Sequence, residues 1–403
     1  MPLSLATADS ALKEDYLPTI REQVNNTFNL LNQIDKNSDD IEGRRAVLSL
    51  HVSRNSGVGA RAEGGTLPTA GNQSYAEERV PLRYNYGRIQ LNGPVIRAMK
   101  SDKGSFTRAV ESESKGVTND LKRDVNRQIA GTSDGVIAGC GVTTASTTLV
   151  LAATTTLVQL RQFEVGMVID AGPVATPTSA FSARTIQSIN RAAKTMVISG
   201  AVVTTAATDF ISRSGAGGAT TSQKELTGLQ TIVAASGTLH NVDPTVNPTW
   251  VSYVRATVGT ISDNVFELAV DTIGIEGGEI PGYIITTDGV RRAYSNTLTS
   301  QKRFNDTNSL DLKGGFKSLS VSAGGGDIPL TWDRDIPTGF AFVLGLPHLK
   351  QHEMSDWEFM DEDGAILSRV SGVDAYEATL FKYHELCTDK RNAHGVMTGI
   401  TEA

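Results

Sequence analysis

The side chains that could carry catalytic or metal chemistry are spaced in ways that match no common motif. His352 and Glu353 begin a run like the His-Glu-x-x-His motif of zinc proteases, but its last position is Asp356. The acidic run at 361–364 misses the ligand spacing of an EF-hand calcium loop. Several glycine-rich stretches lack the Lys-Ser/Thr pair that ends a phosphate-binding loop. We therefore expect no enzyme activity, and no catalytic, cofactor-binding or metal-binding residue.

The cysteine content and the charge exclude further classes of function. Cys140 and Cys387 lie far apart and form no Cys-x-x-Cys pair, which favours buried free thiols over a disulfide framework. The net charge is −7, from 37 basic and 44 acidic residues, and this argues against a sequence-specific nucleic-acid reader. The first residues lack a signal-peptide pattern, and no stretch is apolar enough to span a membrane. We expect folding in the cytoplasm.

One long amphipathic helix is predicted over residues 105–130. Its apolar residues recur at spacings of four or seven, which is typical of one helix face. They are Phe106, Val110, Val117, Leu121, Val125 and Ile129. Ser105 is suited to cap the first turn and Gly131 to end the last one. The rest of the chain is expected to be organised around this helix.

A hairpin with a very long tip is predicted just before that helix. Leu48, Leu50 and Val52 alternate with polar residues, as in a half-buried strand. A second alternating run covers residues 82–86, and the residues between the two runs, 54–80, are mostly polar. Connections longer than about 15 residues are uncommon in compact domains, so this tip is expected to reach outward or to serve a function.

The remaining segments differ in composition. Residues 11–37 have a helical apolar pattern that Pro18 interrupts, and we expect an arm that docks on another surface. Residues 140–214 are rich in threonine, alanine and valine, with short apolar runs between turns, which predicts an inserted β-domain.

After a flexible joint, the chain should form an α/β layer. We expect helices over 263–274 and 289–298 and strands over 281–287, 316–321 and 339–344. Residues 357–360 and 365–370 should pair as a hairpin around the acidic turn at 361–364.

This order of elements resembles the HK97-like major capsid proteins of tailed bacteriophages. Four local stretches are also similar to that family: ELTGLQTIV at 225–233, DRDIPTGFAFVL at 333–344, WEFMDEDG at 357–364 and YEATLFKY at 376–383. The resemblance implies an α+β fold with an arm, an extended hairpin (E-loop), a long spine helix and an α/β axial domain, here with a small inserted β-barrel-like domain. The implied divisions are an arm (1–43), the hairpin (44–97), a peripheral domain with the spine helix (98–139), the insert (140–214), the axial domain (215–326) and a return to the peripheral domain with the C-terminal strands (327–403).

The resemblance also implies a function and a set of partners. The chain would self-assemble into pentamers and hexamers of an icosahedral shell around double-stranded DNA, with assembly in the host cytoplasm and the mature protein in the virion. A portal protein, a decoration protein and non-specifically held DNA are the implied partners. Because the hairpin is reached by residue 44 without a long scaffolding segment, a separate scaffolding protein, or none, is expected.

Contacts between copies are expected to be non-covalent. Some family members cross-link a lysine of the hairpin to a neighbouring asparagine, but this chain has no lysine between Lys36 and Lys100. The residues expected to pair between copies are Arg54, Arg61, Arg79 and Arg83 on one side and Glu111, Glu113 and Asp361 on the other. The alternatives are an encapsulin-like compartment with the same fold, a phage tail or surface β-protein, and an enzyme.

Overall fold

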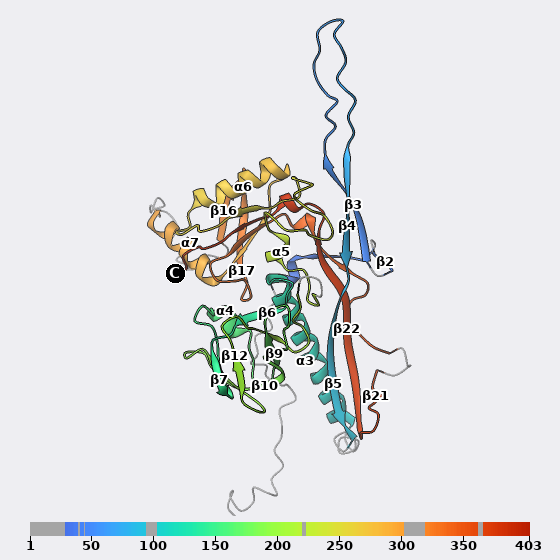
Figure 1. Ribbon diagram of the computed structural model, residues 1–403, viewed down its shortest axis with the longest axis vertical. Coiled ribbons are helices and arrows are strands. Elements are labelled where there is room, and N and C mark those ends of the chain that lie inside the picture. The colour runs from blue at the N-terminus through green and yellow to red at the C-terminus, as the bar shows by residue number, and fades with distance from the viewer. Residues whose placement is uncertain are drawn as a thin grey trace, which may run out of the picture.

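The structure is a computed structural model, and it describes residues 29–38, 41–43, 45–93, 103–219, 223–301, 319–361 and 366–403. A body of sheets and helices carries a β unit on one side and a long hairpin that projects beyond it (Figure 1). Most of the helix expected over 11–37 lies outside the described residues. Its described end is not α-helical, because η1 (Leu31–Gln33) is a 3-10 turn and β1 (Asp35–Asn37) is a strand. None of the helices in the described part is long and apolar enough to cross a membrane.

The longest strand, β22 (Ala375–Thr388), is the axis of an elongated sheet (Figure 1). β5 (Arg83–Asn92) runs antiparallel to it along one edge, from Ala375 opposite Asn92 to His384 opposite Arg83. The other edge holds three short strands in succession, and β1 extends the sheet beyond the first of them. These strands are β19 (Leu349–Glu353), β20 (Glu358–Phe359) and β21 (Ser368–Arg369).

The prediction of a hairpin within residues 357–370 is therefore wrong. β20 pairs with residues 380–381 and β21 with residues 376–377, so both bind β22 and not each other. The Asp-Gly turn signal is local, whereas β22 offers a long edge whose backbone groups need partners. Residues 362–365, which hold most of that turn, lie outside the described residues.

The long helix is confirmed as α3 (Lys103–Ala130), which begins two residues earlier than expected. Its buried face includes Leu121, Val125 and Ile129 and packs against β5. Gly87 of β5 makes this approach possible, because a Cβ there would lie 2.6 Å from Cγ1 of Val117.

The hairpin is also present, but with a different second strand. β3 (Arg45–Ser53) pairs with β4 (Ser74–Pro81), and β2 (Ile41–Glu42) pairs with the start of β3. The run at 82–86 that was expected to pair with β3 belongs instead to β5. Both runs have the alternation of a half-buried strand, so alternation alone does not specify the partner. The tip between the strands covers residues 54–73.

The insert is a β unit of its own beside α3 (Figure 1). Its main sheet has the order β6-β13-β9-β10-β11-β8, and a bridge between Cys140 and Leu151 joins the two ends of this order. These strands are β6 (Val136–Gly139), β8 (Thr148–Val150), β9 (Val168–Gly172), β10 (Phe181–Asn190), β11 (Thr195–Ile198) and β13 (Phe210–Arg213). A second pair is formed by β7 (Thr143–Ser146) and β12 (Val203–Thr205).

Two details of the insert differ from the expectation. Its sheet begins with β6, before the expected boundary at 140. The apolar run at 156–160 is a short helix, α4 (Leu157–Arg161), and not a strand. Thr156 and Gln159 form a reciprocal capping box at its start, which favours a helix over an extended strand.

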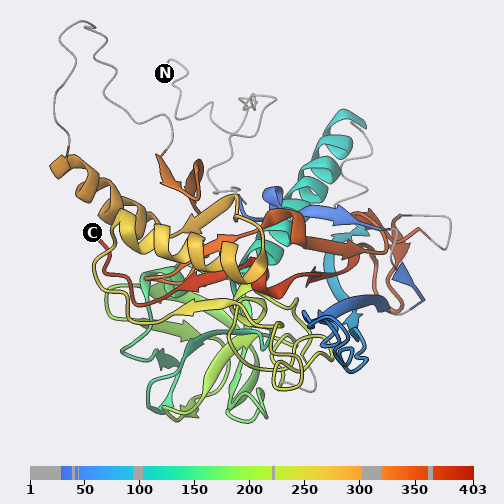
Figure 2. The same ribbon diagram turned by 90° about the horizontal axis from the view of Figure 1, so that it is seen from above.

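The α/β layer is a sheet of order β14-β23-β18-β15-β17-β16 with α6 (Asp263–Gly277) and α7 (Asp288–Gln301) over one face (Figure 2). Its strands are β14 (Tyr253–Arg255), β15 (Tyr283–Thr286), β16 (Leu319–Ala323), β17 (Gly326–Trp332), β18 (Ala341–Leu344) and β23 (Gly395–Met397). The expected axial boundary at 326 is too early, because β18 and β23 belong to this sheet. α6 also ends later than expected, at a left-handed Gly278.

A single core joins the base of the hairpin to the rest of the body. It contains Leu50 and Val52 of β3, Val125 and Ile129 of α3, and residues of β15 and β18 on the sheet face away from α6. Three short elements complete the body, namely α5 (Leu229–Ile232), η2 (Leu346–His348) and η3 (Arg391–Ala393). Both cysteines are buried and free, as the sequence predicts.

Candidate assembly surface

The hairpin tip, residues 54–73, projects away from the body of its own chain (Figure 1). Val58 and Leu67 are 84% and 81% exposed, so the tip presents apolar side chains to its surroundings. Its two arms approach closely at Gly57, where a Cβ would lie 2.8 Å from the carbonyl oxygen of Thr69. A polar ribbon with exposed apolar side chains is suited to lie on another surface.

Three of the four predicted arginines lie on exposed parts of the hairpin. Arg54 is exposed where the tip begins, and Arg61 is exposed within it. The Arg61 guanidinium donates hydrogen bonds to the carbonyl oxygens of Ala60 and Thr66, which order the tip locally. Arg79 lies on the outward face of β4 and forms an ion pair with Glu77 of the same strand, 3.1 Å away. These side chains are accessible to a neighbouring copy.

Arg83 is the exception, and its expected role as a contact between copies needs correction. Its Nε lies 3.0 Å from Oε2 of the buried Glu385, and its Nη1 donates to the carbonyl oxygen of Gln223. The side chain is only 20% exposed. Arg83 therefore holds β5 to β22 and to the segment that enters α5 within its own chain, which leaves it unsuited to reach a neighbour.

The predicted acidic partners are not brought to these arginines within one chain. Glu113 on α3 and Asp361 after β20 are exposed, and the side chain of Glu111 lies outside the described part of the structure. Among the described residues, no ion pair joins these acids to the four arginines. Their pairing between copies stays a prediction.

The base of the hairpin rests on a tight turn that the sequence did not reveal. His240 and Asn241 both have positive φ between Leu239 and Val242, which is the pattern of a type I′ turn. The backbone N–H of Arg79 donates to the carbonyl oxygen of His240 at 2.8 Å. Nδ1 of His240 also lies 2.8 Å from Oε1 of the buried Glu78. The turn thus anchors β4 to the body.

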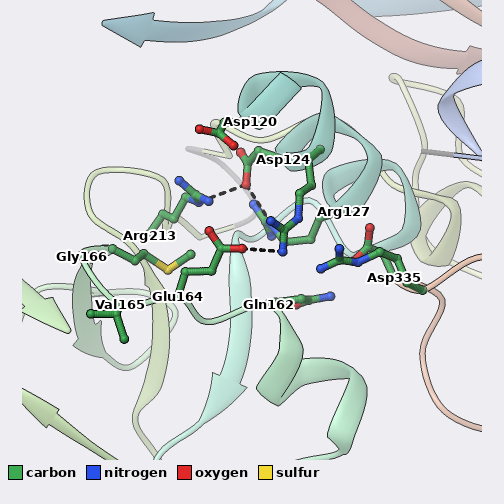
Figure 3. Close-up of a pocket in the computed structure, with 12 residues that line it drawn as sticks. Asp120, Asp124, Arg127, Gln162, Glu164, Val165, Gly166, Arg213 and Asp335 are labelled. Atoms are coloured by element: carbon green, nitrogen blue, oxygen red, sulfur yellow. Dashed lines mark hydrogen bonds and ion pairs between the residues drawn. The ribbon is translucent and has the colours of Figure 1, made fainter. Parts of the chain in front are cut away.

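A pocket of about 330 Å³ lies where α3 meets the insert, and it is lined by paired charges (Figure 3). Arg127 binds Asp124 at 3.0 Å and Glu225 at 2.5 Å, and Arg213 of the insert lies 3.0 Å from Asp124. Arg123 of α3 pairs with Glu164 of the insert. Two of these ion pairs, Arg213 with Asp124 and Arg123 with Glu164, fasten the insert to α3.

The electrostatics of this pocket follow from its burial. Burial alone would raise the pKa of Asp124, but the positive charges of Arg127 and Arg213 lower it to about 2. Burial raises the pKa of Glu225, which shares Arg127 with Asp124. Asp124, Arg127 and Arg213 therefore form a network of structural ion pairs at this pocket.

One motif match was missed in the sequence and is explained by the fold. Residues 131–135 have the letters Gly-x-Ser-x-Gly, like the nucleophile elbow of hydrolases. That elbow needs a strand followed by a helix, whereas these residues follow α3 and precede β6. Ser133 is buried, and its Oγ lies 3.2 Å from Oγ1 of Thr231. The serine therefore joins two segments of the core.

His352 and Glu353, which begin the protease-like run, are on the strand β19 and not on a helix. Glu353 instead pairs with the buried Lys382, whose Nζ also lies 5.0 Å from the centre of the Trp357 ring. These residues stabilise the sheet around β22.

No protein-family model matches the sequence, and no curated protein is similar to it. Solved structures are similar in fold. The capsid asymmetric unit of cyanophage A-1(L) is 13% identical with a TM-score of 0.61, over 99% of this chain and 100% of that chain. The capsid of a native GTA particle is 10% identical with a TM-score of 0.54, over 99% of both chains.

At identities this low, the likeness concerns the fold, and it extends over nearly the whole chain. The hairpin, long helix and α/β layer occur in the expected order. This chain has the HK97-like fold of phage capsid proteins.

Proposed function

We propose that this chain is a major capsid protein that assembles into pentamers and hexamers of an icosahedral shell around double-stranded DNA. The observation that carries the proposal is the hairpin tip, which extends away from its own body in a chain whose whole length matches capsid proteins in fold. A segment that exposes apolar residues without a partner in its own chain is expected to bury them against a second copy.

The outer face of α6 offers a second surface for contacts between copies. Leu268 and Ile275 of this helix and Ile280 after it are 49%, 82% and 56% exposed. Because α6 lies on the side of the α/β layer away from the insert (Figure 1), its exposed apolar residues suit contacts between copies. Many repeats of such modest contacts add up in a closed shell.

The charge of the chain fits this role. Arg54, Arg61 and Arg79 are proposed to pair with Glu111, Glu113 or Asp361 of a neighbouring copy, each pair contributing little by itself. The net charge of −7 suits a wall that encloses DNA without gripping its phosphates.

The proposal includes the partners and the location of a capsid. A portal protein, a separate scaffolding protein and a decoration protein are the proposed partners, with assembly in the host cytoplasm and the mature protein in the virion. We take the insert as a small barrel-like domain on the shell, since the Cys140–Leu151 bridge joins the two ends of its sheet. No catalytic role is part of the proposal.

Electron microscopy of the expressed chain tests this function. The chain would be produced alone and together with the products of neighbouring genes, then imaged in negative stain. Closed shells, rings of five or six, or tubes are expected. Particles of single-chain size under both conditions would contradict the proposal. Shells that contain protein cargo and no DNA, when produced during infection, would favour the encapsulin-like alternative.

A further inference from the structure

Three potential metal ligands meet at the base of the hairpin, although the sequence separates them widely. Glu78 comes from β4, His240 from the type I′ turn and Cys387 from β22. One ligand atom of each lies within 4.8 Å of the other two. All three side chains are buried, with 0% exposure for Glu78 and 4% for His240. A carboxylate, an imidazole and a thiolate form a donor set that suits Zn²⁺.

The two distances from Glu78 to the other ligand atoms are close to those of a tetrahedral zinc site. Oε1 of Glu78 lies 2.8 Å from Nδ1 of His240 and 3.4 Å from Sγ of Cys387. Zinc bonds of about 2.0–2.3 Å place such ligands roughly 3.3–3.6 Å apart. A shift of about half an ångström in the Glu78–His240 pair therefore makes room for the ion.

The surroundings of Glu78 and His240 are compatible with a bound cation. Nε2 of His240 lies 3.4 Å from Oγ1 of Thr227, and a proton on Nε2 would leave a lone pair on Nδ1 facing the Glu78 carboxylate. Oε2 of Glu78 is buried and has no hydrogen-bond partner. An orphaned buried carboxylate oxygen requires an explanation, and a bound cation supplies one.

A cavity of about 50 Å³ borders Cys387, and Leu48, His348, Lys350 and Asp389 are among its other lining residues. This volume exceeds what one water molecule needs. Neither Glu78 nor His240 lines the cavity, so the candidate site rests on the three protein ligands.

We propose that Glu78, His240 and Cys387 bind one Zn²⁺ ion, which clamps the base of the hairpin to the body. The ion would be neutralised by the carboxylate and the thiolate. It would link three segments that otherwise meet through hydrogen bonds, and it would fix β4 where the hairpin leaves the body. The site is structural, and it is independent of whether the chain forms a shell.

The test measures zinc in the full-length chain without an affinity tag. The protein is treated with a chelator, incubated with ZnSO4, passed through a desalting column and analysed for metal. We expect one zinc per chain. Co²⁺ in place of Zn²⁺ should give the near-ultraviolet absorption of a cobalt–thiolate bond. Chelation should also lower the melting temperature, because an ion that binds only the folded state stabilises it.

Two variants and a matched control decide the outcome. Cys387→Ser and Glu78→Gln should bind zinc at least about tenfold more weakly, and chelation should no longer change their melting temperature. Because Glu78→Gln keeps the shape of the side chain, weaker zinc binding in this variant would not be caused by misfolding. Cys140→Ser removes the other buried thiol, in the insert, and should bind zinc like the wild type. A wild-type chain without zinc, or equal zinc in Cys387→Ser, Glu78→Gln and Cys140→Ser, would overturn the proposal.

Discussion

Charged side chains make different contacts at the hairpin tip and beneath the hairpin. We call the second region the junction, meaning the buried contacts that hold the hairpin and α3 to the rest of the body. At the tip and on the outer face of β4, Arg61 and Arg79 are exposed and contact groups close to them in sequence. At the junction, Arg83 binds Glu385 and Arg127 binds Glu225, across long stretches of sequence and with little exposure. A buried charge that loses its partner is costly, whereas an exposed pair contributes little.

This difference separates two tasks within one hairpin. The junction determines how firmly the hairpin is attached to its own subunit, and the tip is left to recognise another copy. Changes at the junction should therefore alter the stability of the isolated chain, and changes at the tip should alter assembly alone. Four predictions test this separation, in order of decreasing effect on the stability of the chain.

The largest loss is expected for Arg391→Met. The guanidinium of Arg391 is buried, and burial lowers its pKa to about 10, so it stays charged at neutral pH. It donates hydrogen bonds to the carbonyl oxygens of Thr231, Ile232, Ser236, Gly237 and Trp250. Because the variant leaves these acceptors buried without donors, it should lower the free energy of unfolding by roughly 4 kcal/mol.

Chemical denaturation of the unassembled chain measures this loss. Arg391→Lys serves as the comparison, since it keeps the charge but lacks the planar fork and should recover little. A loss under about 1 kcal/mol in Arg391→Met would show that water binds the carbonyl oxygens in place of the guanidinium. This part of the junction would then be open to solvent.

Glu385→Ala should lower the free energy of unfolding by about 3 kcal/mol, because it removes the partner of Arg83 at a nearly buried position. It also leaves the backbone N–H of Thr227 without its acceptor, which is now 2.6 Å away. Glu77→Ala, which removes the exposed partner of Arg79, is the matched control and should have no measurable effect. Denaturation measures both variants. Equal losses of unfolding free energy would show that ion pairs at the junction contribute no more to stability than those on the outer face of β4.

Asp124→Asn should remove a pH-dependent part of the stability. The pKa of Asp124 is about 2 in the folded chain, against an ordinary value of 3.8. A lowered pKa stabilises the fold above the ordinary value, and this stabilisation is lost as the pH falls from about 4 towards 2. The variant should be about 2 kcal/mol less stable at neutral pH and should show a flatter stability profile in that window.

Thermal unfolding followed between pH 2 and 7 measures this profile. Asp170→Asn in the insert tests whether any buried aspartate gives the same result, since Asp170 accepts hydrogen bonds mainly from backbone N–H groups. An unchanged acid profile in Asp124→Asn would mean that the arginines around it do not hold its charge.

The double variant Arg61→Glu with Arg79→Glu should leave the unfolding of the isolated chain unchanged, because both side chains are exposed. Shells of this variant should be less stable than wild-type shells at low salt, and added salt should narrow the difference, because it screens the repulsion that replaces attraction between copies. Light scattering against salt concentration measures this. Arg191→Glu reverses an exposed arginine of the insert and should behave like the wild type. Unchanged shell stability in the double variant would remove these arginines from the interface.

The sequence predicted elements where the signal is local and repeated. The apolar spacing from Phe106 to Ile129 determined α3 almost to its ends, because a helix satisfies its hydrogen bonds within itself. The alternation around Leu50 likewise determined β3 and which of its faces is buried. The order of these elements was enough to predict the HK97-like fold.

Pairing and burial between distant segments were decided only in the tertiary structure. A strand satisfies its hydrogen bonds with another strand, so the alternation at 82–86 could not show that its partner is β22 and not β3. Nor does any spacing relate Glu78 to His240 and Cys387, which lie 162 and 309 positions away. Glu78, on the inward face of β4, was the local sequence feature that pointed to this cluster. It can be recognised as inward-facing only once β4 is known to be a strand. Charges meet at the junction because the fold buries them together, and that burial is a property of the packed chain.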